Sequence, residues 1–199
     1  MILIIDNYDS FTYNLVQYVG TINENLKNIK NDALTLDAIK AMNLSHIIIS
    51  PGPGKPKNTG ICLNIIKDIS PLIPTLGICL GHQAIAYHYD AKIVNSQNIV
   101  HGETSRIRHN NKSLLFHDIP LEFNATRYHS LCVDRKFTSN NLNITSWSDD
   151  QEIMSLEHKK YPIYGIQFHP ESILTEYGMQ IINNFINVIN NTYFNPFVF

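Results

Sequence analysis

The chain has 199 residues, 44% of them hydrophobic, and a formal net charge of −2 at pH 7. This length suits one large domain, which we expect to span residues 1–199, and the hydrophobic fraction is sufficient for a substantial core. Acidic and basic residues nearly balance, and no basic stretch is present. This charge pattern argues against binding to nucleic acid or to a lipid surface.

The three cysteines lie far apart in the sequence and lack metal-ligand spacing: Cys62, Cys79 and Cys132. We therefore expect no metal site. An odd cysteine count without a secretory signal predicts reduced thiols in the cytoplasm, or in the plastid stroma if the chain is plastid-encoded. The apolar run at residues 1–5 is too short for a signal peptide or a membrane span, and it predicts a first strand.

The first half of the chain alternates strand and helix patterns. Short apolar runs, the second of them weak, predict strands within residues 2–5, 21–32, 46–49 and 75–78. Helical spacing of apolar residues predicts helices over residues 11–19, 35–42 and 62–69. This alternation predicts an α/β fold with an open, mainly parallel sheet flanked by helices.

Several residues near the predicted helix ends are suited to capping. Ser10 or Thr12 is expected to cap the first helix, and Gly20 is expected to end it. Thr35 is expected to cap the second helix.

From about residue 91 the pattern changes to short runs separated by turn residues. These runs predict antiparallel strands, at the edge of the sheet or in a second layer, over residues 91–94, 105–108, 125–129, 142–147, 153–158 and 164–168. A closing amphipathic helix is indicated by Met179, Ile182, Phe185, Ile186 and Ile189. Residues 190–199 are expected to form a loose tail or a contact with a partner.

A cysteine stands between two glycines where the strand at 75–78 meets a helical run. The pattern Gly-Ile-Cys-Leu-Gly at residues 77–81 has the form of a nucleophile elbow with sulfur in place of oxygen. The glycines remove Cβ atoms that would obstruct the turn, and the helix N-terminus favours a thiolate. Most lone cysteines are simply buried, but the glycine spacing favours Cys79 as a nucleophile.

A nucleophilic thiolate needs a base, and the base needs a third group that orients it. His169 and Glu171 follow the last predicted strand and stand two residues apart across Pro170. In an extended segment such residues point to the same side. Most histidines are structural or solvated, but the strand exit and the neighbouring carboxylate favour His169, since the strand ends are expected to converge near Cys79.

The segment Pro-Gly-Pro-Gly at residues 51–54 follows another predicted strand. Such a segment is compatible with a plain turn. Beside a nucleophile elbow it also suits a rigid loop whose backbone N–H groups stabilise an oxyanion, with Gly52 and the N–H of Leu80 as donors.

These motifs together resemble the class I (triad) glutamine amidotransferases. The resemblance rests on Gly-Ile-Cys-Leu-Gly-His-Gln at 77–83, Ser-Pro-Gly-Pro-Gly at 50–54 and Gly-Ile-Gln-Phe-His-Pro-Glu-Ser at 165–172. Segments 6–12, 101–105 and 127–131 are similar to the small subunit of anthranilate synthase and to the glutaminase subunit of aminodeoxychorismate synthase. The similarity extends from residue 1 to about residue 189.

The resemblance implies that glutamine is hydrolysed through a glutamyl thioester, with Cys79, His169 and Glu171 as the catalytic triad. It implies an oxyanion hole at Gly52 and Leu80. It also implies glutamine recognition by Gly52, Pro53, Gly54, Gln83, Ser130 and Leu131. Ammonia would pass to a chorismate-using synthase subunit, the expected partner, which would hold Mg²⁺, whereas this chain would need no cofactor.

Two residues depart from the family pattern. Glu103 stands where a lysine is usual, in a segment expected near the partner, and Asp90 replaces a glycine after the elbow helix. If that glycine served a left-handed turn, aspartate can still adopt it at some cost. Neither change touches the triad.

Alternatives remain within and outside this family. We favour the anthranilate (tryptophan) route, with the aminodeoxychorismate (folate) route or one small subunit shared by both as the alternative. The glutaminase parts of GMP synthase or carbamoyl-phosphate synthase fit segments 6–12 and 127–131 less well. A non-catalytic binding module predicts a missing triad residue, and a cysteine peptidase does not explain the glutamine-binding positions.

Overall fold

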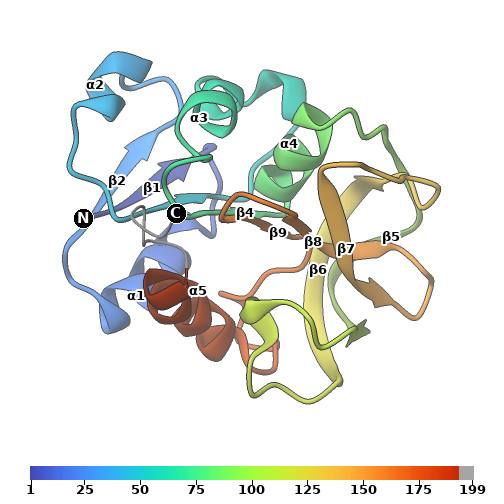
Figure 1. Cartoon of the computed structure of the whole chain (residues 1–199). Coiled ribbons are helices and arrows are strands. Elements are labelled where there is room, and N and C mark those ends of the chain that lie inside the picture. The colour runs from blue at the N-terminus through green and yellow to red at the C-terminus, as the bar shows by residue number, and fades with distance from the viewer. Residues whose placement is uncertain (193–199) are drawn as a thin grey trace.

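The computed structural model describes residues 1–192 (Figure 1). Nine strands form one sheet in the order β2-β1-β3-β4-β9-β8-β7-β5-β6. The strands are β1 (Ile2–Asp6), β2 (Leu26–Lys30), β3 (His46–Ile49), β4 (Thr75–Ile78), β5 (Ile93–His109), β6 (Glu122–Val133), β7 (Leu142–Ser148), β8 (Ile153–His158) and β9 (Ile163–Ile166). The helices are α1 (Thr12–Ile22), α2 (Leu36–Lys40), α3 (Cys62–Asp68), α4 (Leu80–His88) and α5 (Gly178–Thr192), with short 3₁₀ helices η1 (Pro56–Asn58) and η2 (Leu114–Phe116).

One half of the sheet is parallel and lies between two layers of helices. Strands β2, β1, β3, β4 and β9 pair in parallel, which confirms the predicted α/β fold. Helices α1 and α5 cover one face, and α2, α3 and α4 cover the other (Figure 1). Because alternate side chains point to opposite faces, Ile2 and Ile4 enter one core while Leu3 and Ile5 enter the other. Burial on both faces explains the continuous apolar run at the start of the chain.

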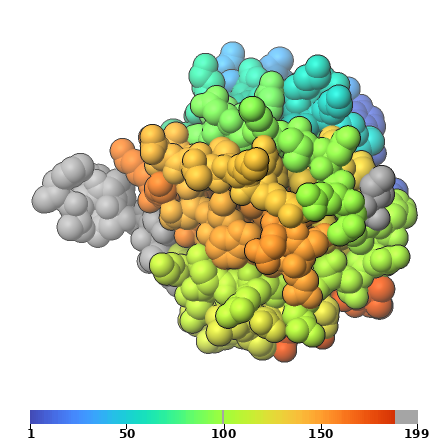
Figure 2. Space-filling model, turned by 90° about the vertical axis from the view of Figure 1, so that its right-hand side faces the viewer, coloured from blue at the N-terminus to red at the C-terminus, as the bar shows by residue number. Residues whose placement is uncertain are grey.

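The other half of the sheet is antiparallel and continues the same layer. Strands β8, β7, β5 and β6 extend the sheet beyond β9, which confirms the first of the two expected arrangements, antiparallel strands at the edge of the sheet, over a second layer. Two predicted runs merge into the 17-residue β5, whose pairing with β6 is irregular between Asn95 and Val100 and again between His101 and Glu103. Figure 2 looks onto this end of the molecule, where the green-to-orange part of the chain forms the face.

Strand β9 corrects one sequence-based expectation. The run at 164–168 was expected among the antiparallel strands, but β9 pairs in parallel with β4 on one side and antiparallel with β8 on the other. It therefore joins the two halves of the sheet. The strand also ends at Ile166, so the segment that leads to His169 is already outside the regular strand.

The predicted ends of α1 are wrong, whereas the cap of α2 is confirmed. No side chain of the predicted pair caps α1: the Asp9 carboxylate accepts from the Phe11 N–H at 2.7 Å, and the Thr12 hydroxyl donates to Asp6. Gly20 remains helical because the helix continues to Ile22. In α2, the Thr35 hydroxyl accepts from the Ala38 N–H, as expected of a cap.

Helix α5 buries the predicted stripe only in part. Ile182, Phe185 and Ile186 are buried, but Met179 is 39% exposed and Ile181 takes the buried place instead. Of the tail predicted at 190–199, residues 190–192 belong to α5 instead, and residues 193–199 lie outside the described residues, as does the side chain of Ile189. No helix within residues 1–192 is long and apolar enough to cross a membrane.

Candidate active site

The site forms at the edge where the parallel strands end. Asn7, Ser50, Cys79 and Gln167 directly follow β1, β3, β4 and β9, respectively. Parallel strands place their carboxyl ends at one edge of a sheet, so these four segments converge. A cleft of about 320 Å³ lies there, lined by Tyr8, Asp9, Ser10, Phe11, Pro51, Gly52, Pro53, Cys79, His101, Tyr128 and His169.

Cys79 occupies a strained turn between β4 and α4. Its backbone has φ +50° and ψ −100°, a conformation that L-residues rarely adopt. A Cβ atom added to Gly77 would lie 2.5 Å from the backbone of Gly81, and one added to Gly81 would lie 2.4 Å from the carbonyl oxygen of Ile49. Both glycines are thus required by close approach, and the turn has the form of a nucleophile elbow.

His169 and Glu171 form a buried pair beside the elbow. His169 Nδ1 and Glu171 Oε1 are 2.7 Å apart, and the residues are 2% and 3% exposed. Burial disfavours the imidazolium, but the charge of Glu171 and the interaction with Cys79 outweigh it, so the pKa of His169 lies well above 6.5. His169 Nε2 has no hydrogen-bond partner within residues 1–192, and it is therefore the nitrogen available to the sulfur or to a substrate.

Two further histidines near the site behave differently. Burial lowers the pKa of His82 to about 4, and burial together with the charge of Arg127 lowers the pKa of His129 to about 3. Both rings are therefore neutral at pH 7. Of the three buried histidines near the site, His169 is the one whose pKa is raised rather than lowered.

The other two cysteines are buried and do not line the cleft. Burial raises the pKa of the Cys62 and Cys132 thiols to about 12, so both are unreactive thiols. Within the described part of the chain, no three His, Cys, Asp or Glu side chains are arranged to hold a metal ion.

The loop at residues 51–54 packs directly against the elbow. A Cβ atom on Gly52 would lie 2.5 Å from Asn7 Cβ and 3.1 Å from a side-chain carbon of Leu80. Asn7 fixes the loop, since its Nδ2 donates to the Ser50 carbonyl and its backbone N–H donates to Ser50 Oγ, both at 2.9 Å. The two predicted oxyanion donors, Gly52 and Leu80, are thus neighbours.

The remaining predicted recognition residues lie around the same edge. Gln83 Nε2 donates to the carbonyl oxygen of Leu131 at 2.9 Å, which joins α4 to β6. Ser130 is exposed on β6 beside Leu131. Pro53 lines the cleft, and Gly54 has φ +89° with open space beside it, a conformation that favours glycine.

Three side chains contact the site without having been assigned a role from the sequence. Gln167 Nε2 lies 3.5 Å from Cys79 Sγ. The rings of Tyr128 and Phe11 pack edge-on against His169 at centroid distances of 5.0 and 6.2 Å. Gln167 was detectable, because it stands two residues before His169 in an extended segment and so points to the same side.

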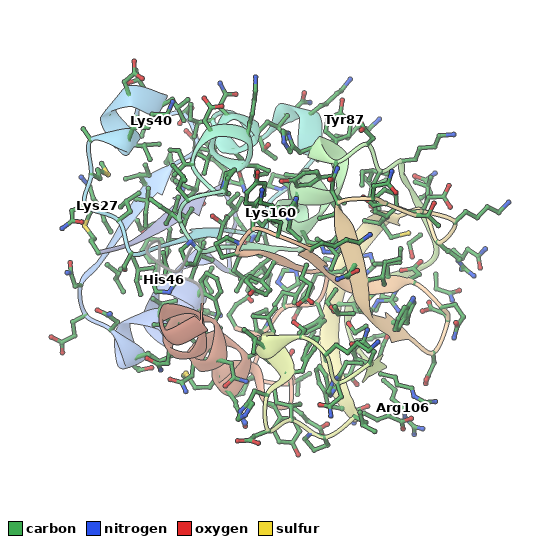
Figure 3. The ribbon with its side chains drawn as sticks, in the orientation of Figure 1. Lys27, Lys40, His46, Tyr87, Arg106 and Lys160 are labelled. Atoms are coloured by element: carbon green, nitrogen blue, oxygen red, sulfur yellow. The ribbon has the colours of Figure 1, made fainter. Side chains whose placement is uncertain are left out.

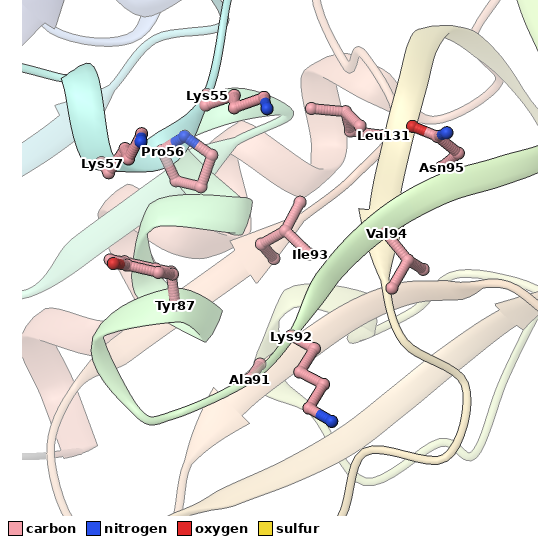
Figure 4. Close-up of a pocket in the computed structure, with 10 residues that line it drawn as sticks. All are labelled: Lys55, Pro56, Lys57, Tyr87, Ala91, Lys92, Ile93, Val94, Asn95 and Leu131. Carbon is pink, nitrogen blue, oxygen red and sulfur yellow. The ribbon is translucent and has the colours of Figure 1, made fainter.

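A larger cavity, of about 530 Å³, lies next to the site (Figure 4). Lys55 and Lys57 approach it from the segment after Gly54, Tyr87 from α4, and Lys92 from the segment before β5. None of Cys79, His169 and Glu171 lines it. Leu131 lines this cavity and its carbonyl oxygen accepts a hydrogen bond from Gln83, so it lies between the cavity and the predicted recognition positions.

Known proteins are similar to this chain in sequence and fold. Anthranilate synthase component 2 of Cyanophora paradoxa is 50% identical over 191 residues, covering 96% of this chain and all of that protein. Aminodeoxychorismate/anthranilate synthase component 2 of Bacillus subtilis is 45% identical, covering 94% and 95%. The chain spans about a third of the bifunctional protein TrpGD of Thermotoga maritima, at 48% identity.

Structural similarity and a family profile agree with these relatives. A solved structure from Thermoplasma acidophilum, assigned to GMP synthase, superposes with a TM-score of 0.83 at 25% identity, covering 95% of this chain and 93% of that one. The profile of the class-I glutamine amidotransferases matches residues 3–188, which include every segment of the site. The chain therefore belongs to the class-I glutamine amidotransferase family and is a glutamine amidotransferase.

Proposed function

We propose that this chain is the glutaminase subunit of an anthranilate synthase and supplies ammonia to a chorismate-using synthase subunit. The observation that carries this proposal is the buried His169–Glu171 pair beside a cysteine held on a strained elbow. The relatives named as anthranilate synthase component 2 support the choice of acceptor. As a component 2, the chain would act in a heteromer with its component 1.

Cys79 starts the reaction in this proposal. Its sulfur attacks the side-chain carboxamide carbon of glutamine, a C–S bond forms, and the C–N bond breaks. His169, held by Glu171, gives a proton to the departing nitrogen, which leaves as ammonia. His169 then takes a proton from water, whose oxygen attacks the thioester and releases glutamate. The C–S bond breaks and Cys79 is regenerated.

The surrounding backbone supports these steps. The N–H groups of Gly52 and Leu80 donate to the oxyanion that develops on the carboxamide oxygen. Residues 52–54, Gln83 and the backbone at 130–131 hold glutamine. No cofactor of this chain takes part, and Mg²⁺ belongs to the partner subunit. We place the complex in the cytoplasm, or in the stroma if the chain is plastid-encoded.

A specific observation also favours a second acceptor reaction. The Bacillus subtilis relative is named for both aminodeoxychorismate and anthranilate synthase, and a relative from Escherichia coli is named aminodeoxychorismate synthase component 2. A folate-route partner, alone or in addition, is therefore the second candidate.

Identification of the product tests both candidates. The purified chain is mixed with glutamine, chorismate, Mg²⁺ and each synthase subunit in turn, with ammonium in place of glutamine as the control for the synthase. Anthranilate with the first partner supports the proposal, and aminodeoxychorismate alone replaces it with the second candidate. If no glutamate is released with either active partner, the proposed function is wrong.

A further inference from the structure

Gln167 lies between the nucleophile and a predicted glutamine-binding residue. It follows β9 directly and is fully buried. Its Oε1 accepts from Gln83 Nε2 at 3.1 Å, and its Nε2 points to Cys79 Sγ at 3.5 Å. Its own backbone is held in place, because its N–H donates to the Met154 carbonyl at 2.9 Å.

The direction of these hydrogen bonds follows from one fixed acceptor. The backbone carbonyl of Leu131 can only accept, so the Gln83 atom 2.9 Å from it must be the amide nitrogen. The same nitrogen then donates its second hydrogen to Gln167, which must present its oxygen. The amide nitrogen of Gln167 therefore faces the Cys79 sulfur. The Leu131 carbonyl on β6 thus determines, through Gln83, that a donor and not an acceptor faces Cys79.

This arrangement has a consequence for the sulfur. Because Gln167 is fully buried and its backbone is held by Met154, its amide provides a fixed donor to the sulfur. A hydrogen bond to a charged acceptor is stronger than one to a neutral acceptor, so the contact favours the thiolate over the thiol. It also leaves the Gln83 carboxamide oxygen as the group that can accept a hydrogen bond from bound glutamine.

We propose that Gln167 is a positioning residue of the glutaminase site. It donates to the Cys79 sulfur and accepts from Gln83, and it thereby holds the nucleophile and the glutamine-binding side chain in one fixed relation. This inference rests on the proposed glutaminase function. It assigns Gln167 no role in proton transfer or bond making.

The first test replaces Gln167 by methionine, which has similar length and remains apolar. The variant keeps the packing but loses both amide contacts. We expect alkylation of Cys79 by iodoacetamide to slow about tenfold, the effect of losing one hydrogen bond to a charged group. In the complex with the synthase subunit, kcat for glutamate release should fall by a similar factor, while KM for glutamine should rise less.

The second test uses Gln167→Glu, which keeps the acceptor for Gln83. A buried carboxyl beside the sulfur has a raised pKa, so it donates a proton to the sulfur at low pH and repels the thiolate once ionised. The glutaminase rate of Gln167→Glu relative to the unchanged chain should therefore fall between pH 6 and pH 9. The matched control is Gln151→Glu, the same change on an exposed residue in the β7–β8 turn, and its relative rate should be constant.

The outcomes separate this inference from the proposed function. If the unchanged chain releases glutamate but both Gln167 variants alkylate and turn over at unchanged rates, Gln167 has only a packing role and the inference is wrong. If the unchanged chain releases no glutamate, the proposed function fails, and the alkylation rates still decide whether Gln167 acts on the sulfur. If Gln167→Met does not fold, the pH series of Gln167→Glu decides.

Discussion

The backbone of Cys79 has a strained conformation that places its side chain at the turn between β4 and α4. Its φ is positive, and on either side Gly77 approaches Gly81, and Gly81 approaches Ile49, too closely for a Cβ atom on either glycine. The turn therefore depends on the glycines, whereas the proposed chemistry depends on the sulfur. A substitution that changes only the sulfur tests the chemistry alone.

Cys79→Ser should remove glutamine-dependent product formation and preserve ammonia-dependent formation by the partner. A hydroxyl at this position is almost never ionised, so we expect glutamine-dependent rates to fall about a thousandfold or more. The measurement compares both nitrogen sources in the purified complex. Loss of the ammonia-dependent rate as well would indicate misfolding or a different role for the chain.

His169→Ala should slow the formation and hydrolysis of the thioester without preventing assembly with the partner. Loss of a general acid and base typically costs a factor of about 10² to 10⁴ in rate. Turnover of glutamine and co-elution with the synthase subunit are the two readouts. An unchanged turnover would remove His169 from the triad.

Sequence reasoning singled out the elbow and the His169–Glu171 pair, which the structure brings to one edge of the sheet, because each had a local pattern. Cys79 is marked by flanking glycines, and His169 with Glu171 is marked by i, i+2 spacing. Tyr128 has no such pattern, because its contact with His169 depends on β6 passing the end of β9, far away in the sequence. Contacts of this kind follow from tertiary packing and are not visible in a short motif.

At the scale of single elements, the C-terminus of α4 contains the departure noted at Asp90. Its φ is +67°, so this aspartate occupies the left-handed position that a glycine was expected to serve. The Ala91 N–H donates to the Ala86 carbonyl at 3.0 Å and the Asp90 N–H to Tyr87 at 3.1 Å, the pattern of a Schellman motif. Aspartate thus preserves the helix end in a strained conformation.

Asp90→Gly should stabilise the chain. Glycine adopts the left-handed region without the steric cost that an L-residue has there, and its greater freedom in the unfolded chain offsets part of the gain. We expect the free energy of unfolding to rise by up to about 1 kcal/mol, measured by urea denaturation. Asp90→Ala is the control and should not stabilise.

Strand β6 contains a buried ion pair that joins separate parts of the antiparallel half. Arg127 is 1% exposed, and its guanidinium contacts Glu152, Asp150 and His129. Glu152 is fully buried and also accepts from Ser96 Oγ. These contacts connect β6 with the β7–β8 turn and with β5.

Arg127→Leu should destabilise the chain by about 3 kcal/mol or more, because it leaves the Glu152 carboxylate buried without its cation. Thermal and urea unfolding provide the measurement. Arg106→Leu is the matched control, since Arg106 is largely exposed and its contact with Glu122 is long, at 3.8 Å. Equal losses in the two variants would contradict the importance of burial here.

Element ends were predicted less well than element types, for reasons visible at α1 and β5. Gly20 was expected to end α1, but the helix continues to Ile22. In β5, two short runs were separated in the sequence by polar residues, yet pairing with β6 and its bulges carries the strand through them. The continuous strand depends on cross-strand hydrogen bonds to β6, and the local propensity of the β5 residues does not reveal these bonds.

For the whole molecule, buried histidines contribute to the dependence of stability on pH. His46 lies inside, between the sheet and α5, whereas Lys40 and Arg106 project from the periphery (Figure 3). Burial lowers the pKa of His46 and His82 to about 4 and that of His129 to about 3. Below pH 6.5 the unfolded chain binds protons that these rings do not, so the free energy of unfolding falls as pH decreases toward 4. The raised pKa of His169 acts oppositely, since its contribution is present below pH 6.5 and is lost as pH rises.

His46→Leu should weaken the acid dependence. The ring nitrogens of His46 have no hydrogen-bond partner within residues 1–192, so leucine removes a titrating group without breaking a bond. Between pH 4.5 and 6, the slope of the free energy of unfolding with pH should decrease by about 1 kcal/mol per pH unit. Urea midpoints across this range measure it. The exposed His117→Gln serves as control, and an equal change in slope there would contradict the assignment.

The overall architecture was predicted correctly in its parallel half because that half is built from local βαβ units. The position of β9 was not predicted, since it depends on which strand edge remains free after β4 has paired with β3. Residues 163–166 have the apolar character of any buried strand. Their sequence does not indicate which strands lie beside them.

The central place of β9 has a consequence for the order in which the protein is made. This strand is synthesised after the other eight, yet it is inserted between β4 and β8. A chain emerging from the ribosome exposes the Cys79 turn early, but His169 and Gln167 come only with the segment that follows β9. A partly synthesised chain therefore carries the thiol without its proposed base, so on the proposed mechanism glutamine hydrolysis begins only once the sheet has closed.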